Sequence, residues 1–576
     1  MAYSIHKSDV LVIGSGGAGL RTAIEAHDRG ANVLVLGKCK RGDAHTVLAT
    51  GGINAALATM DPRDSWLVHS ADTLREGRFI ADVRDVETLC KNAPRAIQEL
   101  VDYGVRFHRE RDGRLTQRFF GAHTYRRTCF VGDRTGKAIE EALVRQVQKR
   151  RIPFLGEVYI TNLLMNGRAV NGAFGFDMNT GELLAFHAKA VVLATGGYSR
   201  LYNRSSSRIL ENTGDGVALA YAVGAQLADM EMLQFHPTGM IWPRSTEGVL
   251  VTEAVRGEGG VLLNANNERF MQKYHPRGEL GPRDVVARAI YSEIAEGRGT
   301  KHNGVWLDIT NRQLSYITER LPKIYEQFKR VGVDISRERM EVAPTAHYSM
   351  GGVRVHRETQ MTNIKGLFAV GEVTSGVHGA NRLGGNSLLE TIVFGRLCGE
   401  HVARYVKELE LASLDETNIT KYEKELQNLL DSKGKYKPQK LRAELQELMW
   451  DNAGIIRNSK QLHAGMEKMN ALKVKFRKVK IPGTSMAENA NLVSALDLRG
   501  LFVPAEALLR SAIARTESRG AHYRLDYPRE KNTLYNIVCY KSGEDMKLGR
   551  HRATKPRGNL ARAIVQNERA EHKMLE

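Results

Sequence analysis

A glycine-rich segment of the chain carries an arginine that could bind a carboxylate. Residues 377–390 read VHGANRLGGNSLLE, and Arg382 is the only Lys or Arg in the segment, beside three glycines. Glycine permits positive φ angles and lets the backbone approach a flat ligand. A guanidinium offers a planar fork of donors that matches a carboxylate. This composition suits a site where a small organic acid meets a bound cofactor; read alone, the segment could also be a surface turn with a solvated arginine.

Side chains suited to anion binding and proton transfer recur in four other motifs. These are QFHPTG with His236, VTEAVRGEGG with Thr252, Glu253 and Arg256, PRDVVAR with Arg283, and APTAHYSMGG with His347. Histidine, threonine and arginine can donate hydrogen bonds to an anion, and a carboxylate can pass a proton. Read alone, RDVVAR is an amphipathic helix start with Asp284 as the charge partner. The motifs therefore indicate a site only if the fold brings them together.

The elements that would position these motifs begin with a nucleotide-binding turn. Residues 9–13 (DVLVI) predict a buried strand, a helix follows to about Arg29, and residues 32–36 predict a second strand. Between the first strand and the helix lies a GxGxxG motif, residues 14–19, in the context that binds a pyrophosphate at a helix N-terminus. The acidic residue that an NAD site would need near position 37 is absent, because Gly37 and Lys38 stand there.

Later segments continue this pattern and enclose an insertion. Residues 190–195 and 367–370 predict further strands of the same sheet, and they bracket an inserted region of about 240–348 that begins just after HPTG. Beyond residue 405 the apolar spacing predicts helices over 420–431 and 438–456, separated by a charged break at 433–440. The part after about residue 520 predicts a short strand, 534–540, and basic coil.

The bulk composition excludes several classes of protein. A chain of 576 residues is expected to form two to four domains, and 42% hydrophobic with 26% charged residues is typical of a globular protein. No run approaches the ~18 apolar residues that a membrane span needs, and the N-terminus fits neither a signal nor a transit peptide. Five dispersed cysteines disfavour a disulfide framework or an iron–sulfur site. The net charge of +19 is spread widely, without the compact basic and aromatic block of a nucleic-acid site.

Taken together, these motifs resemble those of a known family. From about residue 8 to 526, the chain is similar to the flavoprotein subunit of succinate dehydrogenase and fumarate reductase, a family that also includes L-aspartate oxidase. The resemblance implies an α/β fold with a Rossmann-type FAD-binding domain, an inserted α+β capping domain, a C-terminal helical domain and a small extension. The expected ranges are 1–239 and 349–405 for the FAD-binding domain, 240–348 for the capping domain, 406–520 for the helical domain and 521–576 for the basic extension.

The resemblance also implies the cofactor and its contacts. In GDAHTVLATGGI (42–53), His45 aligns with the histidine that carries FAD covalently, a link that would raise the flavin's potential enough to oxidise succinate. The family's Arg-Ser before this histidine is replaced here by Asp43 and Ala44, and Thr50 departs from the usual residue before the two glycines. No metal site is implied. The other residues expected to contact FAD are Gly14, Gly16, Gly17, Ala18, Gly19, Lys38, Thr46, Gly51, Gly52, Ala194, Thr195, Gly196, Asp215, Glu372, Ser387 and Leu388; an acid at Asp215 or Glu372 would supply the ribose contact missing at position 37.

For the substrate, the resemblance implies a dicarboxylate held at two points. His236 and Thr252 would bind one carboxylate, while His347 and Arg382 bind the other, once the insert closes on the flavin domain. Arg283 would exchange the proton opposite the hydride and relay it through Glu253 and Arg256. Because the reference pKa of arginine is ~12.5 or higher, this role requires Arg256 and a dry site to depress that of Arg283.

Phe120 bears on the choice between subfamilies. It precedes Gly121-Ala122, where succinate dehydrogenase and fumarate reductase have phenylalanine and L-aspartate oxidase has a glutamate for the substrate ammonium. An apolar ring leaves a buried ammonium unpaired, which costs several kcal/mol. The sequence MWDNAGIIR (449–457) and the missing Arg-Ser look closer to L-aspartate oxidase, so that soluble enzyme with noncovalent FAD stays an alternative.

The resemblance further implies succinate and fumarate as substrates, a separate iron–sulfur subunit that exchanges electrons with the flavin and, through it, membrane anchor subunits. The chain would then lie at the cytoplasmic side of the inner or plasma membrane as a peripheral protein. A more remote alternative is a basic, flavin-containing RNA-binding protein, which the +19 charge and the basic tail from Arg550 favour. We expect no nucleic-acid partner, because this alternative is disfavoured by the joint presence of six site side chains: His236, Thr252, Glu253, Arg283, His347 and Arg382. The direction of the reaction in the cell does not follow from these residues.

Overall fold

The chain begins with a βαβ unit whose glycines have a packing role. The computed structural model describes residues 3–575. Strand β1 (Tyr3–Ile13) leads through the glycine turn into helix α1 (Gly17–Asp28), and β2 (Val33–Leu36) returns parallel to β1. Gly14 has φ +119°, and a Cβ there would lie 2.1 Å from the carbonyl oxygen of Ala194. The turn therefore requires glycine for both its backbone angle and the close approach of the next strand.

The main sheet contains the other strands that the sequence predicts. Its order is β6-β2-β1-β9-β8-β7, with β16 paired to β9. Strands β6 (Phe154–Leu155), β9 (Leu183–Leu193) and β16 (Leu367–Ala369) run parallel to their neighbours β2, β1 and β9, whereas β7 (Val158–Asn166) and β8 (Ala169–Asp177) form an antiparallel pair on β9. Val10, Leu11 and Val12 are fully buried because helices and strands cover both faces of β1.

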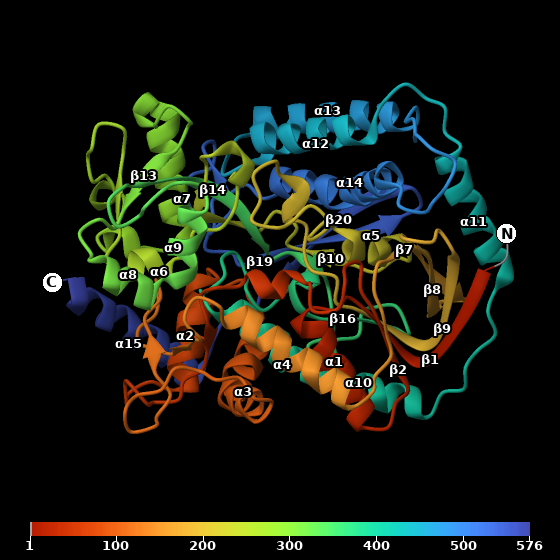
Figure 1. The fold of residues 1–576 in the computed structure, drawn as a ribbon, viewed down its shortest axis with the longest axis horizontal. Helices are drawn as coiled ribbons and strands as arrows, with labels where there is room; N and C mark the ends of the chain where they lie inside the picture. Colours follow the sequence, from red (N-terminus) through yellow and green to blue (C-terminus); the bar gives the residue numbers. More distant parts are fainter. Residues whose placement is uncertain (1–2, 576) are drawn as a thin grey trace.

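Long helices cover one face of this sheet and fix the loops at its edge. Helix α10 (Asn386–Lys407) packs along α1, and α3 (Val83–Asp102) and α4 (Thr135–Lys149) lie beside them in the lower part of Figure 1. Because α10 begins at Asn386, shortly after Arg382, its packing against α1 fixes the position of the arginine loop.

The inserted region has its own sheet, which residues on both sides of it complete. The order is β11-β14-β13-β12, formed by β11 (Leu233–Met240), β14 (Met340–Ser349), β13 (Val305–Asp308) and β12 (Val261–Leu263). Helices α6 (Ala254–Gly257), α7 (Arg283–Glu293), α8 (Leu314–Arg320) and α9 (Pro322–Lys329) surround it, at the left of Figure 1. The first and last strands connect the insert directly to the flavin-side loops.

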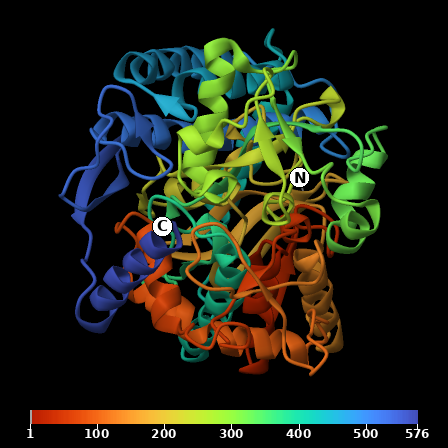
Figure 2. The ribbon, with the colours of Figure 1, turned by 90° about the vertical axis from the view of Figure 1, so that its left-hand side faces the viewer.

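The predicted helical region is present, and the chain end joins the rest of the fold. Helices α11 (Glu416–Leu430) and α12 (Pro438–Ala453) match the two expected helices; α13 (Ser459–Phe476) and α14 (Ala490–Ala514) complete the layer at the top of Figure 1. Strands β19 (Tyr535–Ser542) and β20 (Asp545–Arg552) extend a sheet with β10 (Leu227–Ala228) and β15 (Gly352–Val353). Helix α15 (Gly558–Leu575) lies beside α2 (Trp66–Glu76), as Figure 2 shows, and Asn567 donates a hydrogen bond to Asp72 at 2.8 Å.

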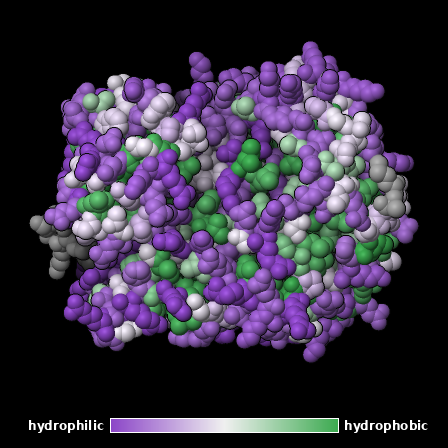
Figure 3. Space-filling model, in the orientation of Figure 1, coloured by the Kyte–Doolittle hydropathy of each residue, from purple (hydrophilic) through white to green (hydrophobic). Residues whose placement is uncertain are grey.

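The remaining elements are short. They are α5 (Asp215–Ala222), β3 (Ile53–Asn54), β4 (Gln117–Arg118), β5 (Thr128–Cys129), β17 (Ile456–Arg457), β18 (Tyr523–Arg524), the 3₁₀ turns η1 (His45–Leu48), η2 (Ser199–Leu201), η3 (Arg244–Thr246), η4 (Met271–Lys273), η5 (Gly278–Leu280) and η7 (Gly371–Val373), and the π turn η6 (Ile294–Arg298). On the face seen in Figure 3, apolar residues form separate groups among hydrophilic ones. Within residues 3–575, no helix has the length and apolar character needed to span a bilayer.

Glu140 makes the stability of this fold depend on pH. The residue is fully buried in α4, and this burial raises the pKa of its carboxyl group to about 8, although a hydrogen bond with Thr46 acts in the opposite direction. In the unfolded chain a glutamate titrates near ~4.3. Between these values the folded protein holds a proton that the unfolded chain releases, so this contribution to stability falls as pH rises from ~4.3 to 8.

We therefore expect Glu140→Gln to gain stability relative to the wild type as the pH rises from 5 to 8, by about 1 kcal/mol or more. Thermal melts of both proteins across this range measure the difference. Glu141→Gln is the matched control, because Glu141 is the exposed neighbour on the same helix. Parallel pH profiles for the wild type and Glu140→Gln would contradict the prediction.

Candidate active site

A cavity of about 240 Å³ lies where the parallel strands end and the insert begins. Its walls come from the loops that follow β1, β2, β9 and β16, from η1, and from the starts of α5 and α10. The carboxyl ends of parallel strands are where ligands bind in sheets of this kind. The first turn of α1 also lines the cavity. Thr46 accepts the Gly17 N–H at 3.0 Å, and the N-cap residue Gly16 has no side chain to cap the other N–H groups, which fit an anion such as a pyrophosphate.

The residues expected to contact FAD line this cavity with one exception. Gly19 lies inside α1, where a Cβ would meet the carbonyl oxygen of Gly14 at 1.9 Å, so its role is packing within the turn. The lining includes Gly14, Gly16, Gly17, Ala18, Lys38, His45, Thr46, Gly51, Gly52, Ala194, Thr195, Gly196, Asp215, Glu372, Ser387 and Leu388. The start of α1 and the glycine pair Gly51-Gly52 line one cavity, as the binding of an extended dinucleotide requires.

The two acids expected near the ribose already have protein partners. Lys38 Nζ lies 2.9 Å from Asp215 Oδ2 and 2.7 Å from the fully buried Asp497, and Thr213 donates to the other Asp215 oxygen. Glu372 accepts a hydrogen bond from the backbone N–H of Ser349 at 3.1 Å, and burial raises its pKa to about 7. Lys38 thus holds together two carboxylates that lie 177 and 459 positions after it in the sequence. The sequence alone does not reveal such distant partners.

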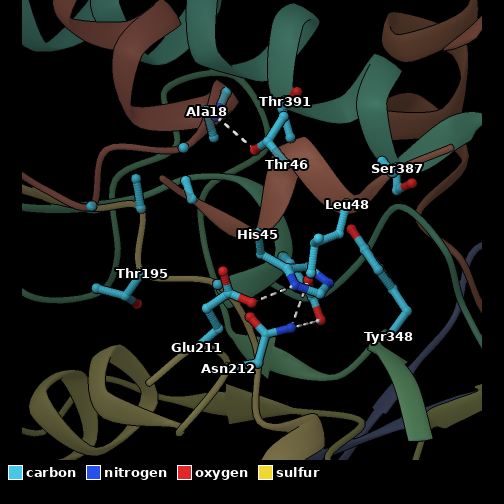
Figure 4. A pocket seen from close by; sticks show the side chains of 18 of the residues that line it. Ala18, His45, Thr46, Leu48, Thr195, Glu211, Asn212, Tyr348, Ser387 and Thr391 are labelled. Atoms are coloured by element: carbon cyan, nitrogen blue, oxygen red, sulfur yellow. Dashed lines mark hydrogen bonds and ion pairs between the residues drawn. The ribbon is translucent and has the colours of Figure 1, made fainter. Parts of the chain in front are cut away.

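His45 forms an ion pair with an acid that no sequence motif indicated. Its Nδ1 lies 3.0 Å from Glu211 Oε2, as the dashed line in Figure 4 shows, and 25% of the His45 side chain is exposed in the cavity. Burial lowers the pKa of His45, but the hydrogen bond and charge of Glu211 outweigh it and raise that pKa above its usual range. For Glu211, His45 and Arg208 outweigh burial and lower the pKa to about 2.

The substrate side chains predicted from separate motifs meet in the same cavity. His236 stands on β11 and His347 on the adjacent strand β14, and their ring centroids are 5.3 Å apart. Thr252, Glu253, Arg283, Arg382 and Phe120 line the cavity with them. The antiparallel pairing of β11 and β14 explains how two histidines so distant in sequence become neighbours.

Gln234 joins the two arginines. Its Oε1 accepts hydrogen bonds from Arg283 Nη1 at 3.2 Å and from Arg382 Nη2 at 3.1 Å, so a single oxygen atom separates the two guanidinium groups. Its Nε2 donates to Asn381 and to the carbonyl oxygen of Arg382. Because side chains two residues apart point to the same face of a strand, the QxH pattern of Gln234 and His236 was a usable sequence signal that the motif-based prediction missed.

A chain of charged groups leads away from the cavity through Glu253. Arg283 Nε donates to Glu253 Oε2 at 2.8 Å, and Arg256 Nη2 lies 3.9 Å from the same oxygen. The backbone N–H of Gly121 donates to the other oxygen at 2.9 Å. Burial would raise the pKa of Glu253, but Arg283 and Arg256 outweigh it and hold that pKa well below its usual range. Arg256 itself lies behind Glu253, outside the cavity lining.

Burial controls the charges of the other anion-binding groups. Burial and the charge of Arg283 lower the pKa of His236 well below its usual range. Burial and the charge of Arg382 do the same to the pKa of His347, so both rings are neutral at pH 7. Burial and Arg283 also lower the pKa of Arg382 to about 10, which leaves it charged. The Arg382 guanidinium packs over the ring of Tyr348 at 4.3 Å, a contact absent from the sequence-based expectations.

Replacing Gln234 should remove the hydrogen-bond acceptor that Arg283 and Arg382 share. In Gln234→Leu, the two guanidinium groups lose their common acceptor and face each other across an apolar side chain, so we expect a drop of about tenfold or more in kcat/KM for the dicarboxylate. Gln234→Glu should instead bind both arginines more tightly and weaken an anionic substrate. Steady-state kinetics with Gln226→Leu as a control, in the loop before β10, tests this; unchanged kcat/KM in both Gln234 variants would contradict it.

The fold and the site together define a class of protein, an α/β flavoprotein with a dinucleotide cradle and a lid-like insert. Comparisons with known proteins agree. Residues 9–388 match the family model described as FAD binding domain, and residues 442–556 match that described as Fumarate reductase flavoprotein C-term. The chain is 47% identical to one of the subunits of the fumarate reductase (CoM/CoB) of Methanothermobacter marburgensis, over 96% of this chain and 100% of that protein.

Two further relatives place the family. The succinate dehydrogenase flavoprotein subunit of Rickettsia bellii is 40% identical, with 92% of each chain covered. A chain of E. coli quinol fumarate reductase superposes with a TM-score of 0.91 at 33% identity, covering 97% of this chain and 99% of that one. The chain belongs to the family of succinate dehydrogenase and fumarate reductase flavoprotein subunits, and it is an FAD-dependent oxidoreductase.

Proposed function

We propose that this chain interconverts succinate and fumarate, passing electrons between bound FAD and a separate iron–sulfur subunit. The observation that carries the proposal is the convergence of Arg283, Arg382, His236 and His347 on one cavity that also contains the cofactor-lining glycines. Two guanidinium groups linked through Gln234 form a positive region matched to a dianion. When bound, the flavin supplies the hydride acceptor or donor.

Four side chains would bind the two carboxylates. In this proposal His236 and Thr252 hold one, and His347 and Arg382 hold the other. His236 Nδ1 lies 3.2 Å from the backbone nitrogen of Thr238 and 3.1 Å from its carbonyl oxygen, and His347 Nδ1 can accept a hydrogen bond from the Ser206 hydroxyl at 2.9 Å. In the tautomer that accepts at Nδ1, each neutral ring would present Nε2–H as a donor to the substrate.

Arg283 would move the proton. It is the one charged cavity residue whose guanidinium also contacts an outward-leading carboxylate, Glu253. Glu253 would pass the proton on to Arg256. All three side chains are buried, which shields this path from water. The insert supplies Thr252, Glu253 and Arg283, so its position over the cavity would both exclude water and complete the site.

We also propose that FAD is attached covalently to His45. Nδ1 is engaged by Glu211, which leaves Nε2 as the ring atom free to face the cofactor. The partner would be an iron–sulfur subunit, because relatives in this family are named as subunits of larger reductases. Through that partner and its membrane anchor, the chain would lie at the cytoplasmic face of the membrane.

The site favours a dicarboxylate without an amino group over an amino acid. The Phe120 ring lies against Gly51 and Gly384, where a Cβ would come within 2.8 Å and 3.1 Å of it, and the nearby Glu253 is paired with Arg283. A substrate ammonium would therefore have no free carboxylate partner among these groups, which disfavours L-aspartate oxidation.

Purified protein tests these points. We expect succinate to reduce an artificial dye, aspartate to give no peroxide, and flavin fluorescence to stay with the polypeptide on a denaturing gel and vanish in His45→Ala. Aspartate-dependent peroxide without succinate activity would favour L-aspartate oxidase. Flavin released on denaturation with intact succinate activity would refute only the covalent attachment.

A further inference from the structure

We propose that a chain of three charged residues, Asp43, Arg208 and Glu211, stabilises the protonated, cationic form of the His45 ring beside the cofactor. The inference rests on the proposed function only in placing the flavin next to His45. It does not require the covalent bond, because Glu211 stabilises the cation in either case: with Nε2 bound to the flavin the cation carries one proton, on Nδ1, and with Nε2 free it carries a proton on each nitrogen. Glu211 is thus a positioning residue that acts through His45.

The geometry of the chain is that of an anchored carboxylate. Arg208 Nε donates to Glu211 Oε1 at 2.7 Å, and the Arg208 backbone N–H donates to Oε2 at 3.0 Å. Oε2 is also the atom that faces His45 Nδ1. Arg208 in turn contacts Asp43 through a close ion pair. Glu211 is 8% exposed, so its charge is little screened by solvent.

Two segments of the chain contribute to this arrangement: one carries Asp43 and the other carries Arg208 and Glu211. Asp43 stands two residues before His45, at the position where the family resemblance leads us to expect arginine. Here the arginine is supplied instead by residue 208, from the loop that also carries Glu211. The positive charge near the histidine is therefore retained, but it now orients an acid against the imidazole.

The other charges around His45 do not cancel the effect of Glu211. Glu372 favours the cation, whereas Arg208 opposes it. His347 is neutral, and the His347–His45 interaction is one of the smaller influences on His347. Lys38 is paired with Asp215 and Asp497, and Asp43 is paired with Arg208. With Glu211 in direct contact, the attraction of the carboxylates exceeds the repulsion from Arg208, and burial is offset.

A cation beside the cofactor should favour the electron-rich, reduced flavin. The charge acts at short range in a cavity with little water, where it is weakly screened. The flavin should therefore be easier to reduce below the pH at which His45 loses its proton than above it. This dependence distinguishes a charge effect from a purely structural role of Glu211.

The test is a pH titration of the visible absorbance and of the reduction potential of the bound FAD in the full-length protein. In the wild type we expect a transition that is absent in His45→Gln. In Glu211→Gln, which keeps the size of the side chain, the midpoint should move to lower pH by about one unit or more, a tenfold change in the ionisation constant. Arg208→Gln should move the midpoint less than Glu211→Gln does, because it removes both the anchor of the carboxylate and a cation that opposes the His45 proton.

Glu247→Gln is the matched control. Glu247 forms a similar ion pair with Arg204 at 3.0 Å but does not line the cavity. An unchanged midpoint in Glu211→Gln, with a wild-type transition that depends on His45, would overturn the proposal; so would a wild type that shows no His45-dependent transition. Failure of succinate turnover with a normal Glu211-dependent midpoint would refute the proposed function and leave this inference standing.

Discussion

Replacing Arg283 with alanine should lower kcat for succinate oxidation by about 10²–10⁴-fold. Arg283 is the cavity group that contacts Glu253, so its loss would remove the path by which a proton leaves the substrate. Arg382, His236, His347 and Thr252 would still bind the dicarboxylate, so KM should change much less than kcat. Arg283→Lys should recover only part of the rate, because an ammonium cannot contact Glu253 and Gln234 with the same fork geometry.

Steady-state kinetics in both reaction directions measures this effect. Arg288→Ala is the control: Arg288 lies on the same helix, α7, and pairs with Asp284 and the carbonyl oxygen of Gly520. A large loss in Arg283→Ala with little loss in the control supports proton transfer by Arg283. A change confined to KM would instead assign it to substrate binding.

Replacing Arg382 with alanine should weaken dicarboxylate binding by about 10²-fold or more, since removing one partner of a buried charged contact costs about 2–5 kcal/mol. The Arg382 side chain is 2% exposed, donates to Ser387 at 2.7 Å and to Gln234 at 3.1 Å, and packs on Tyr348. These contacts hold the guanidinium in one orientation before substrate arrives. Lysine should rescue poorly because it can neither stack in the same way nor donate two parallel hydrogen bonds.

Binding of a dicarboxylate and a monocarboxylate inhibitor, malonate and propionate, separates the role of Arg382 from general damage. The wild type should prefer malonate strongly, and Arg382→Ala should lose most of this preference. Arg404→Ala is the control, because Arg404 lies further along α10 and pairs with Glu400 at the surface. An equal loss of affinity for both inhibitors would show that Arg382 does not distinguish the second carboxylate.

The local elements of the fold were predictable because each is encoded by neighbouring residues. The apolar run before Gly14 predicts a buried strand, and the glycine spacing predicts the turn to α1. The sequence placed β1 only at residues 9–13, whereas it begins at Tyr3, because its first half is only partly buried and contains polar residues such as His6 and Lys7 instead of a continuous apolar run. Backbone pairing with β9 extends the strand beyond its apolar part.

Contacts between distant segments were not predictable in the same way. Residues 521–576 were expected as an extension, but β19 pairs with β10 through Leu227 and Cys539. Lys38 was expected at the cofactor, and nothing in its neighbourhood indicates Asp497 as a partner. Glu211 likewise belongs to no motif that points to His45. Such pairs are fixed by tertiary packing, which a single sequence records only as isolated charges.

The convergence of the site residues was predictable because several motifs each carry a residue suited to the same ligand. Arg283 and Arg382 gain a common role only when both are near one ligand, and the bonds to Gln234 bring them together. Gln234 itself was missed because glutamine carries no charge that would mark an anion site, and its position two residues before His236 was the only local signal.

Anaerobic titration of the purified, FAD-loaded protein tests the central claim most directly. Succinate should bleach the visible absorbance of the oxidised flavin, and fumarate should restore it. The Arg283→Ala protein should still perturb the flavin spectrum on binding the dicarboxylate but bleach far more slowly. No bleaching of the wild-type protein by succinate and no reoxidation by fumarate, or bleaching by aspartate alone, would contradict the account.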